Sequence, residues 1–434
     1  MTPLARLARA LPPGMAAVAA GTVILGAASY VHLAVAGHSL ATVDMARVSV
    51  LWTIVMSIGM GLFFPLEQEL TRIVAARAVH GEGARPVLRR AAVLATGLLT
   101  AVLGLLWIFA RPIADRCFHG DRPMVWALGG AFAGLAVTYT TRGILAGLGR
   151  FTAYGTQLAV DGGLRIVLAL LCAAAGLNSA LAFSLVLTLA PLLACAVTLP
   201  TTLRASKPGA PTAWPDLVRG LGPLIGSTLL AQFVVNAAVL STQLLAPGEV
   251  ALVAALLNAL VLARVPLFVF AALQASLLSG LAGADAAGDR EGFLRMLRRA
   301  CLVVTALSCL GGVPAVLAGS WLIRLLFAAP DVLTRADFLW LVLGTLCYLL
   351  AQVLGQALMV QHRHRAQLAG WLTGTAVLVA VTLLPGDIAL RAVASFAAGT
   401  AATALVMLWT LVRRRGDRDV PSDRPGELLG SATR

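Results

Sequence analysis

The chain has 434 residues, of which 59% are hydrophobic and 12% are charged, and its formal net charge is +14. Its mean hydropathy is +0.89. These values exclude an ordinary soluble globular protein, in which charged residues make up about 25% of the chain.

Twelve apolar stretches follow one another along the chain, each near the roughly 20 residues that a helix needs to cross a bilayer. They lie at residues 15–36, 46–66, 91–110, 124–145, 154–175, 179–199, 220–245, 250–279, 300–319, 336–361, 367–384 and 388–412. The basic segment before the first stretch resembles a signal peptide, but no small-residue cleavage site follows it, so we expect a retained first helix. We therefore predict an all-α polytopic membrane protein, with transport as its leading class of function.

Arginines recur in every second predicted loop, and they set the orientation of the chain. Cytoplasmic loops of membrane proteins retain Arg and Lys during insertion. Such residues precede the first stretch and follow the second, sixth, eighth, tenth and twelfth: Arg6, Arg9, Arg72, Arg77, Arg85, Arg89, Arg90, Arg204, Lys207, Arg290, Arg295, Arg298, Arg299, Arg363, Arg365, Arg413, Arg414 and Arg415. Both termini are predicted to be cytoplasmic, in a plasma or inner membrane. The net positive charge is interpreted as contact with anionic lipid headgroups, and no nucleic-acid partner is expected.

An internal repeat relates the two halves of the chain. The double arginine of PVLRRAAVLATGLL at residues 86–99 recurs in RMLRRACLVVTALS at 295–308, an offset of 209 residues. Trp107 and Trp126 recur as Trp321 and Trp340, each 214 residues later, where we expect an outer aromatic belt. LFFPLEQELTRIVAA in the second stretch matches VFAALQASLLSGLAG in the eighth at an offset of 207.

The repeat predicts two pseudo-symmetric six-helix bundles around a central cavity. An even number of helices in each half means that both halves insert in the same direction. We expect an N-terminal lobe at residues 1–200, a cytoplasmic linker at 201–219 and a C-terminal lobe at 220–412. Residues 413–434 are polar and contain proline, so we expect a disordered cytoplasmic tail.

Few ionisable residues lie in the N-terminal stretches, and each has two interpretations. His32 is either a hydrogen-bonded packing residue or the carrier of a coupling proton, since imidazole titrates near neutrality. Glu67 and Glu69, at the cytoplasmic end of the second stretch, are either interfacial or gate residues that pair with arginines of the other half. Asp161 and Arg165 stand four residues apart on one helix face, either as an intrahelical ion pair or with Arg165 as a cavity cation.

The C-terminal stretches carry neutral amides. They either contact sugar hydroxyls of a substrate or form hydrogen bonds between helices. These candidate binding residues are Gln232, Asn236, Gln274, Gln352 and Gln356.

Three segments resemble a known superfamily: RGILAGLGRFTAYG at 142–155, ARVPLFVFAALQASLLSGLAG at 263–283 and DREGFLRMLRRA at 289–300. They are similar to the multidrug/oligosaccharidyl-lipid/polysaccharide (MOP) exporter superfamily, and within it to the polysaccharide flippase branch, over nearly the whole chain. The resemblance implies a MATE-like V-shaped pair of lobes, alternating access, and a lipid-diphosphate-linked glycan as substrate. Lipid II is not expected, because its flippases have fourteen spans and arginines in the first span.

Arg264 is the position that matches the cavity cations of such flippases. It lies about 22 Å along a helix from Glu249, at the outer end of its stretch, and so deep in the hydrocarbon region. A charged side chain there costs about 2.5 to 3.5 kcal/mol on insertion scales, so it should face an aqueous cavity or a partner. A guanidinium group suits phosphate oxygens. We expect a diphosphate contact, with an internal salt bridge or snorkelling as alternatives.

The leading hypothesis is therefore a flippase or exporter of a polyprenyl-diphosphate-linked oligosaccharide, with membrane lipids and cell-surface polysaccharide synthesis proteins as further candidate partners. The alternatives are a multidrug or cation antiporter and a non-transporting scaffold for cell-envelope synthesis. The antiporter is disfavoured because the first and seventh stretches contain no Asp or Glu. No enzyme motif, metal site, disulfide or cofactor is expected from the spacing of the Cys, His and acidic residues.

Overall fold

The computed structural model describes residues 14–245, 256, 259, 265–327 and 333–418. Among these residues the regular structure is helical and includes no strand. Ten of the described helical segments are long and apolar enough to cross a membrane. The chain is a multi-pass membrane protein, and the predicted all-α fold class is confirmed.

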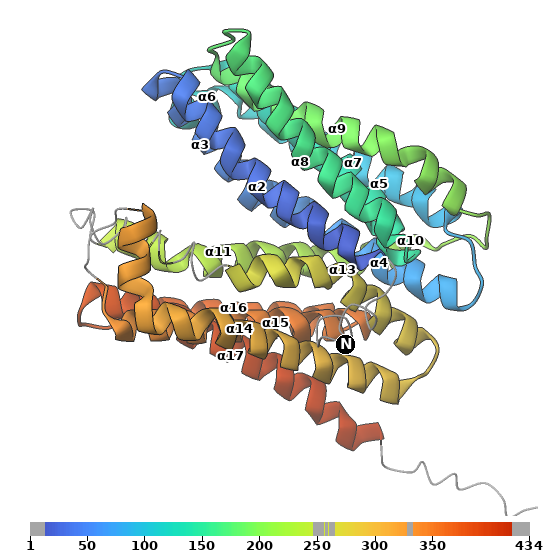
Figure 1. Cartoon of the computed structure of the whole chain (residues 1–434). Helices are drawn as coiled ribbons and strands as arrows, with labels where there is room; N and C mark the ends of the chain where they lie inside the picture. Colours follow the sequence, from blue (N-terminus) through green and yellow to red (C-terminus); the bar gives the residue numbers. More distant parts are fainter. Residues whose placement is uncertain (1–13, 246–255, 257–258, 260–264, 328–332, 419–434) are drawn as a thin grey trace, which may run out of the picture.

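The N-terminal lobe, as far as the structure describes it, contains eight α-helices and one π-helical turn (Figure 1). The second predicted stretch forms one continuous segment of 38 residues that joins α3, the turn η1 and α4. The elements of this lobe are α2 (Met15–Ser39), α3 (Thr42–Ile54), η1 (Val55–Gly59), α4 (Met60–Val79), α5 (Arg85–Ile108), α6 (Ala110–Cys117), α7 (Arg122–Gly147), α8 (Phe151–Ala174) and α9 (Ala180–Ala205).

The C-terminal lobe follows a linker that holds one short helix, α10 (Trp214–Val218). The predicted eighth stretch, 250–279, is described mainly from Val265 onward. The final helix continues six residues beyond the predicted end of the last stretch at 412, so the first part of the predicted tail is helical. The helices of this lobe are α11 (Leu221–Leu245), α13 (Val265–Ala286), α14 (Arg290–Phe327), α15 (Arg335–Val360), α16 (His364–Thr382) and α17 (Ile388–Arg418).

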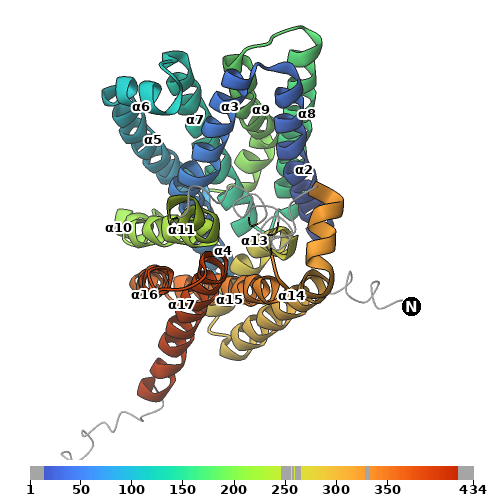
Figure 2. The same ribbon diagram turned by 90° about the vertical axis from the view of Figure 1, so that its left-hand side faces the viewer.

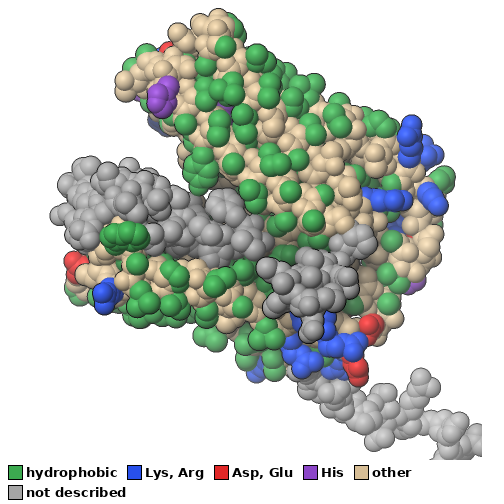
Figure 3. Space-filling view, in the orientation of Figure 1, with side chains coloured by type: hydrophobic (Ala, Val, Ile, Leu, Met, Phe, Trp, Pro, Cys, Tyr) green, Lys and Arg blue, Asp and Glu red, His purple; other side chains and the backbone are tan. Residues whose placement is uncertain are grey.

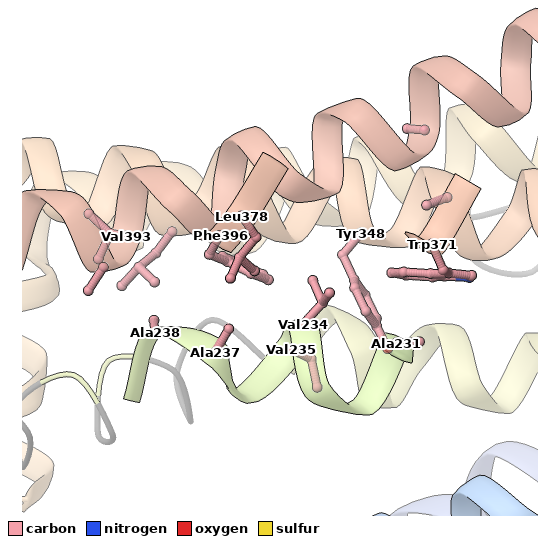
Figure 4. Packing of buried hydrophobic residues seen from close by; sticks show 14 of the residues in the cluster. Ala231, Val234, Val235, Ala237, Ala238, Tyr348, Trp371, Leu378, Val393 and Phe396 are labelled. Atoms are coloured by element: carbon pink, nitrogen blue, oxygen red, sulfur yellow. The ribbon is translucent and has the colours of Figure 1, made fainter. Parts of the chain in front are cut away.

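Each lobe is built around its own apolar core. In the C-terminal lobe, small and branched side chains of α11 pack against aromatic side chains of α15, α16 and α17 (Figure 4). The ring centroids of Tyr348 and Trp371 lie 5.6 Å apart in this core, and Phe396 is buried beside Leu378. Burial of a large apolar side chain stabilises a fold by about 1.5 to 3 kcal/mol in water, whereas within a bilayer close packing supplies this role.

The two lobes meet at one end and diverge at the other (Figures 1 and 2). Contacts between them run from α4 to α13 and α11, and from α2 to α13. The helices α4 and α13 carry the two matching segments of the internal repeat, so the repeat brings equivalent helices together at the centre.

The end at which the lobes meet carries most of the visible Lys and Arg side chains (Figure 3). The positive-inside rule makes this end cytoplasmic. The four repeated tryptophans, Trp107, Trp126, Trp321 and Trp340, are between 39% and 70% exposed, as side chains that face lipid should be. The structure is therefore closed toward the cytoplasm, with its lobes apart on the outer side.

Candidate functional site

The helices α4, α7 and α8 come close together at the cytoplasmic half of the N-terminal lobe because glycines lie at their contacts. A Cβ atom added at Gly143 of α7 would lie 2.8 Å from the Glu67 carbonyl oxygen and from Leu70 Cβ of α4. The turn between α7 and α8 contains Gly149 at a φ of +66°, a conformation that favours glycine. This tight turn returns α8 alongside α7, and polar side chains of all three helices meet in the interior.

Asp161 of α8 binds two guanidinium groups in this interior. Its Oδ1 accepts a hydrogen bond from Arg165 Nε at 2.8 Å, and its Oδ2 lies 3.2 Å from Arg142 Nη2. All three side chains are buried. The predicted intrahelical pair of Asp161 and Arg165 is present, and it is extended by Arg142 from α7. Arg165 is therefore engaged by a carboxylate and does not stand as an isolated cavity cation in this conformation.

Glu67 of α4 lies next to this ion pair network and is also buried. The hydroxyl of Tyr154 on α8 donates a hydrogen bond of 2.7 Å to Glu67 Oε1. The other carboxylate oxygen has no hydrogen-bond partner among the described residues. Glu67 is thus a buried carboxylate that accepts a hydrogen bond from a hydroxyl group through one oxygen.

We call Glu67, Arg142, Tyr154, Asp161 and Arg165 the N-lobe polar cluster. Its two carboxylates balance its two guanidinium groups. Arg142 and Tyr154 were not predicted as site residues, although both stand in the segment RGILAGLGRFTAYG that carries the family resemblance. Two features of the sequence could have indicated them. Arg142 is a charged residue three positions before the end of the predicted stretch 124–145, and Tyr154 is the first residue of the stretch 154–175.

Glu69 and Arg72 form a second polar contact nearer the cytoplasmic end of α4. Glu69 accepts hydrogen bonds from Arg72 Nη2 at 2.6 Å and from Arg72 Nε at 3.1 Å. The remaining terminal nitrogen of Arg72, Nη1, lies 3.1 Å from Nε2 of His362, which belongs to the turn between α15 and α16. The gate hypothesis paired Glu69 with an arginine of the other half, but its arginine is on the same helix, and that arginine makes the contact between lobes.

His32 of α2 is fully buried and packs against Phe183 of α9, with ring centroids 6.1 Å apart. Neither ring nitrogen has a hydrogen-bond partner within the described part of the chain. His32 therefore packs in the interior as expected, but the expected hydrogen bond is not made with any described residue.

The candidate amides of the C-terminal lobe do not form one cluster. Gln232 of α11 reaches across to α4, where its Nε2 lies 3.4 Å from the sulfur of Met60. Asn236 donates to the Gln232 carbonyl oxygen, and Gln352 donates to the Tyr348 hydroxyl. Gln356 is buried, and neither amide atom has a hydrogen-bond partner among the described residues.

Gln274 of α13 is half-buried. It occupies the position that the repeat offset of 207 makes equivalent to Glu67. The predicted substrate contact Arg264 lies outside the described residues, as does Glu249. Gln232 is a candidate amide whose side chain contacts the other lobe, and the remaining amides stay separate candidates.

Comparisons of sequence give relatives without a described activity. No family model matches the chain. An uncharacterised protein of Mycobacterium tuberculosis strain H37Rv is 29% identical over 414 residues, which is 92% of both chains. An uncharacterised protein of Mycobacterium bovis is 26% identical over 399 residues, or 89% of both chains.

Comparisons of structure give transporters. An outward-facing multidrug resistance MATE family transporter of the MOP superfamily has a TM-score of 0.76 at 15% identity, covering 94% of this chain and 96% of that one. A variant of the Vibrio cholerae MATE transporter VcmN has a TM-score of 0.71 at 16% identity, covering 91% and 94%. A MOP superfamily transporter from Pyrococcus furiosus, described by a reversed polarity of its binding pocket, has a TM-score of 0.73 at 14% identity, covering 93% and 95%.

These likenesses show that the chain has the fold of MATE transporters. The predicted MATE-like fold is confirmed, and these neighbours are transporters. They do not confirm the polysaccharide flippase branch.

Proposed function

We propose that this protein moves a polyprenyl-diphosphate-linked oligosaccharide from the cytoplasmic to the outer leaflet by alternating access of its two lobes. The MATE fold supports transport in general, and it is equally consistent with a multidrug antiporter. The choice between the two substrate classes rests on the charges that the membrane-spanning helices carry.

The observation that carries the proposal is the balance of charge inside the N-terminal lobe. Glu69 of α4 and Asp161 of α8 are buried carboxylates that form ion pairs with three arginines of α4, α7 and α8. An organic cation would have to compete with a guanidinium group for Asp161 or Glu69. Arg264, by contrast, adds a positive charge to an otherwise apolar stretch of the sequence, which favours an anionic substrate.

The Pyrococcus furiosus neighbour supports the idea that pocket charge differs between transporters of this fold. Its description links a reversed polarity of the binding pocket to a different function. A cationic pocket in the present chain would select the diphosphate group, while the lipid tail would stay in the bilayer. The amides Gln232 and Asn236 are the candidates for hydrogen bonds to the glycan.

A binding experiment tests the proposal. Purified protein would be titrated with an undecaprenyl-diphosphate-linked glycan across a salt series, with wild type beside Arg264→Ala and with Arg413→Ala, an exposed residue near the end of α17, as control. Loss of the charged hydrogen bonds should weaken binding by about 1.5 to 3 kcal/mol in Arg264→Ala and leave the control unchanged. Absence of binding by the wild type would overturn the substrate assignment, and equal binding by Arg264→Ala would remove Arg264 from the site.

The second candidate is a proton-coupled antiporter of cationic drugs, and Glu67 is the observation that favours it. Glu67 is a buried carboxylate whose described contact is with a hydroxyl group and not with a guanidinium group at salt-bridge distance. Proteoliposomes with an imposed pH gradient would separate the candidates, because drug accumulation that is lost in Glu67→Gln would support the antiporter. Glu67→Gln keeps the acceptor for Tyr154 and removes the titration.

A further inference from the structure

A hydrogen bond joins side chains of the two lobes at their cytoplasmic end. It runs from Arg72 of α4, in the N-terminal lobe, to His362 in the turn between α15 and α16, with 3.1 Å between Arg72 Nη1 and His362 Nε2. Glu69 holds the opposite edge of the same guanidinium group through both of its carboxylate oxygens. Arg72 is therefore fixed by Glu69 in a position from which it points at the other lobe.

The chemistry of this contact sets the protonation state of His362. A guanidinium group has five N–H donors, has no acceptor and stays charged at all relevant pH values. The imidazole Nε2 must therefore accept the hydrogen bond, so the ring is neutral and carries its proton on Nδ1. A protonated His362 would turn an N–H group and a positive charge toward Arg72, and the hydrogen bond could not form.

The surroundings of His362 favour the neutral ring. His362 lies outside the membrane-spanning segments and is exposed to solvent, so protons reach it from the cytoplasmic side. Partial burial and then Arg72 lower the pKa of His362 below its usual value, while the carboxylates of Glu69, Asp285 and Asp216 raise it by less. His364, whose ring centroid lies 6.3 Å from that of His362, is a further titratable group beside it.

We propose that Arg72 and His362 form a pH-sensitive latch, which holds the cytoplasmic ends of the lobes together while His362 is neutral and releases them when His362 is protonated. This inference rests on the alternating access of the proposed function, but not on the identity of the substrate. Acidification of the cytoplasmic side would then favour opening of the inner gate.

The direction of the pH dependence follows from the contact. Protonation of His362 is less favourable in the closed state than in an open state, where Arg72 is distant and the pKa returns toward about 6.5. The latch therefore stabilises the closed state above that value, and its contribution is lost as the pH falls toward the lower pKa of the closed state.

Distance measurements between spin labels test the latch without any substrate. Labels would be placed at Ala78→Cys and Ala287→Cys, two exposed positions on opposite lobes, after replacement of the six natural cysteines. These positions flank a close approach of the lobes, since a Cβ added at Gly283 would lie 3.8 Å from Val79 Cγ2. We expect a single short distance near pH 8 and an added longer distance population near pH 5, on either side of the usual histidine pKa of about 6.5.

Two substitutions of His362 distinguish the effect of its protonation from the effect of replacing its side chain. His362→Gln provides a neutral acceptor, and we expect the short distance at both pH values. His362→Lys provides a permanent cation in place of the ring, and we expect the longer population at both. Because His362 has a φ of +57°, both variants carry the same backbone strain and control for each other.

His364→Gln is the matched control, since it removes the neighbouring imidazole group and should keep the pH response of the wild type. An unchanged wild-type distance at low pH, or an equal pH response in His362→Gln, would overturn the latch. So would a shorter distance at low pH, which would indicate that protonated His362 binds Glu69 instead. If the distance responds to pH but the protein binds no glycan, the latch is supported and the proposed substrate is rejected.

Discussion

Asp161 neutralises two guanidinium groups inside the N-terminal lobe, so a large share of the stability of this lobe should depend on one carboxylate. We predict that Asp161→Asn destabilises the protein by about 3 to 5 kcal/mol, because it leaves Arg142 and Arg165 as buried charges without a direct partner. Thermal unfolding of the detergent-solubilised protein measures the change.

A double variant distinguishes charge imbalance from simple loss of a side chain. Asp161→Asn combined with Arg165→Gln removes one charge of each sign and leaves Glu67 beside Arg142. We expect this double variant to unfold at a higher temperature than Asp161→Asn alone. Equal unfolding temperatures of Asp161→Asn and wild type would show that the ion pairs contribute nothing measurable.

For individual residues, contacts within one helix could be predicted from the sequence, and contacts between helices could not. Asp161 and Arg165 are four residues apart, and helix geometry alone puts them on one face. Arg142 and Tyr154 reach the same cluster from neighbouring helices, and no periodicity in the sequence encodes which faces of α4, α7 and α8 meet. Glu67 was predicted as either an interfacial or a gate residue from its place along the helix, and that place does not give the direction of the side chain, which here contacts Tyr154.

Close packing of α4 against α7 positions the N-lobe polar cluster, and Gly143 makes this packing possible. We predict that Gly143→Ala destabilises the protein by about 1 to 3 kcal/mol, because the added methyl group would collide with the backbone of α4 at Glu67. Thermal unfolding again measures the effect. Gly97→Ala in α5 is the matched control, since an added Cβ there meets nothing within 4 Å. An equal loss of stability in both variants would mean that the contact between α7 and α4 is not responsible.

The helices were largely predictable from the sequence because each must span the bilayer with apolar residues. The ends of the helices and the connections between them were less predictable. The second predicted stretch, 46–66, is part of a segment that runs from Thr42 to Val79, since buried polar residues such as Glu67 and Glu69 interrupt the hydropathy but not the helix. Likewise, α17 continues to Arg418 because arginines are good helix formers beyond the apolar region.

The pairing of two lobes follows from the repeat, whereas their relative orientation does not. Offsets of 207 to 214 residues between matching segments predict two related halves. An inward-open and an outward-open transporter would share the same helices and the same repeat, so the sequence favours neither. The closed side is identified by contacts between the lobes. These are the packing of α4 against α13 and α11 and the hydrogen bond from Arg72 to His362.

The orientation of the open side leads to a prediction about access from outside the cell. Gln232 of α11 contacts Met60 of the other lobe. Asn236 lies one helical turn further along α11. In a background without the natural cysteines, Asn236→Cys should react with a membrane-impermeant maleimide added outside intact cells, because the lobes diverge beyond this contact. Ala78→Cys, exposed at the cytoplasmic end, should react only after the membrane is permeabilised. Labelling of Ala78→Cys but not Asn236→Cys in intact cells would reverse the assigned orientation, and with it the side on which Arg72 and His362 sense pH.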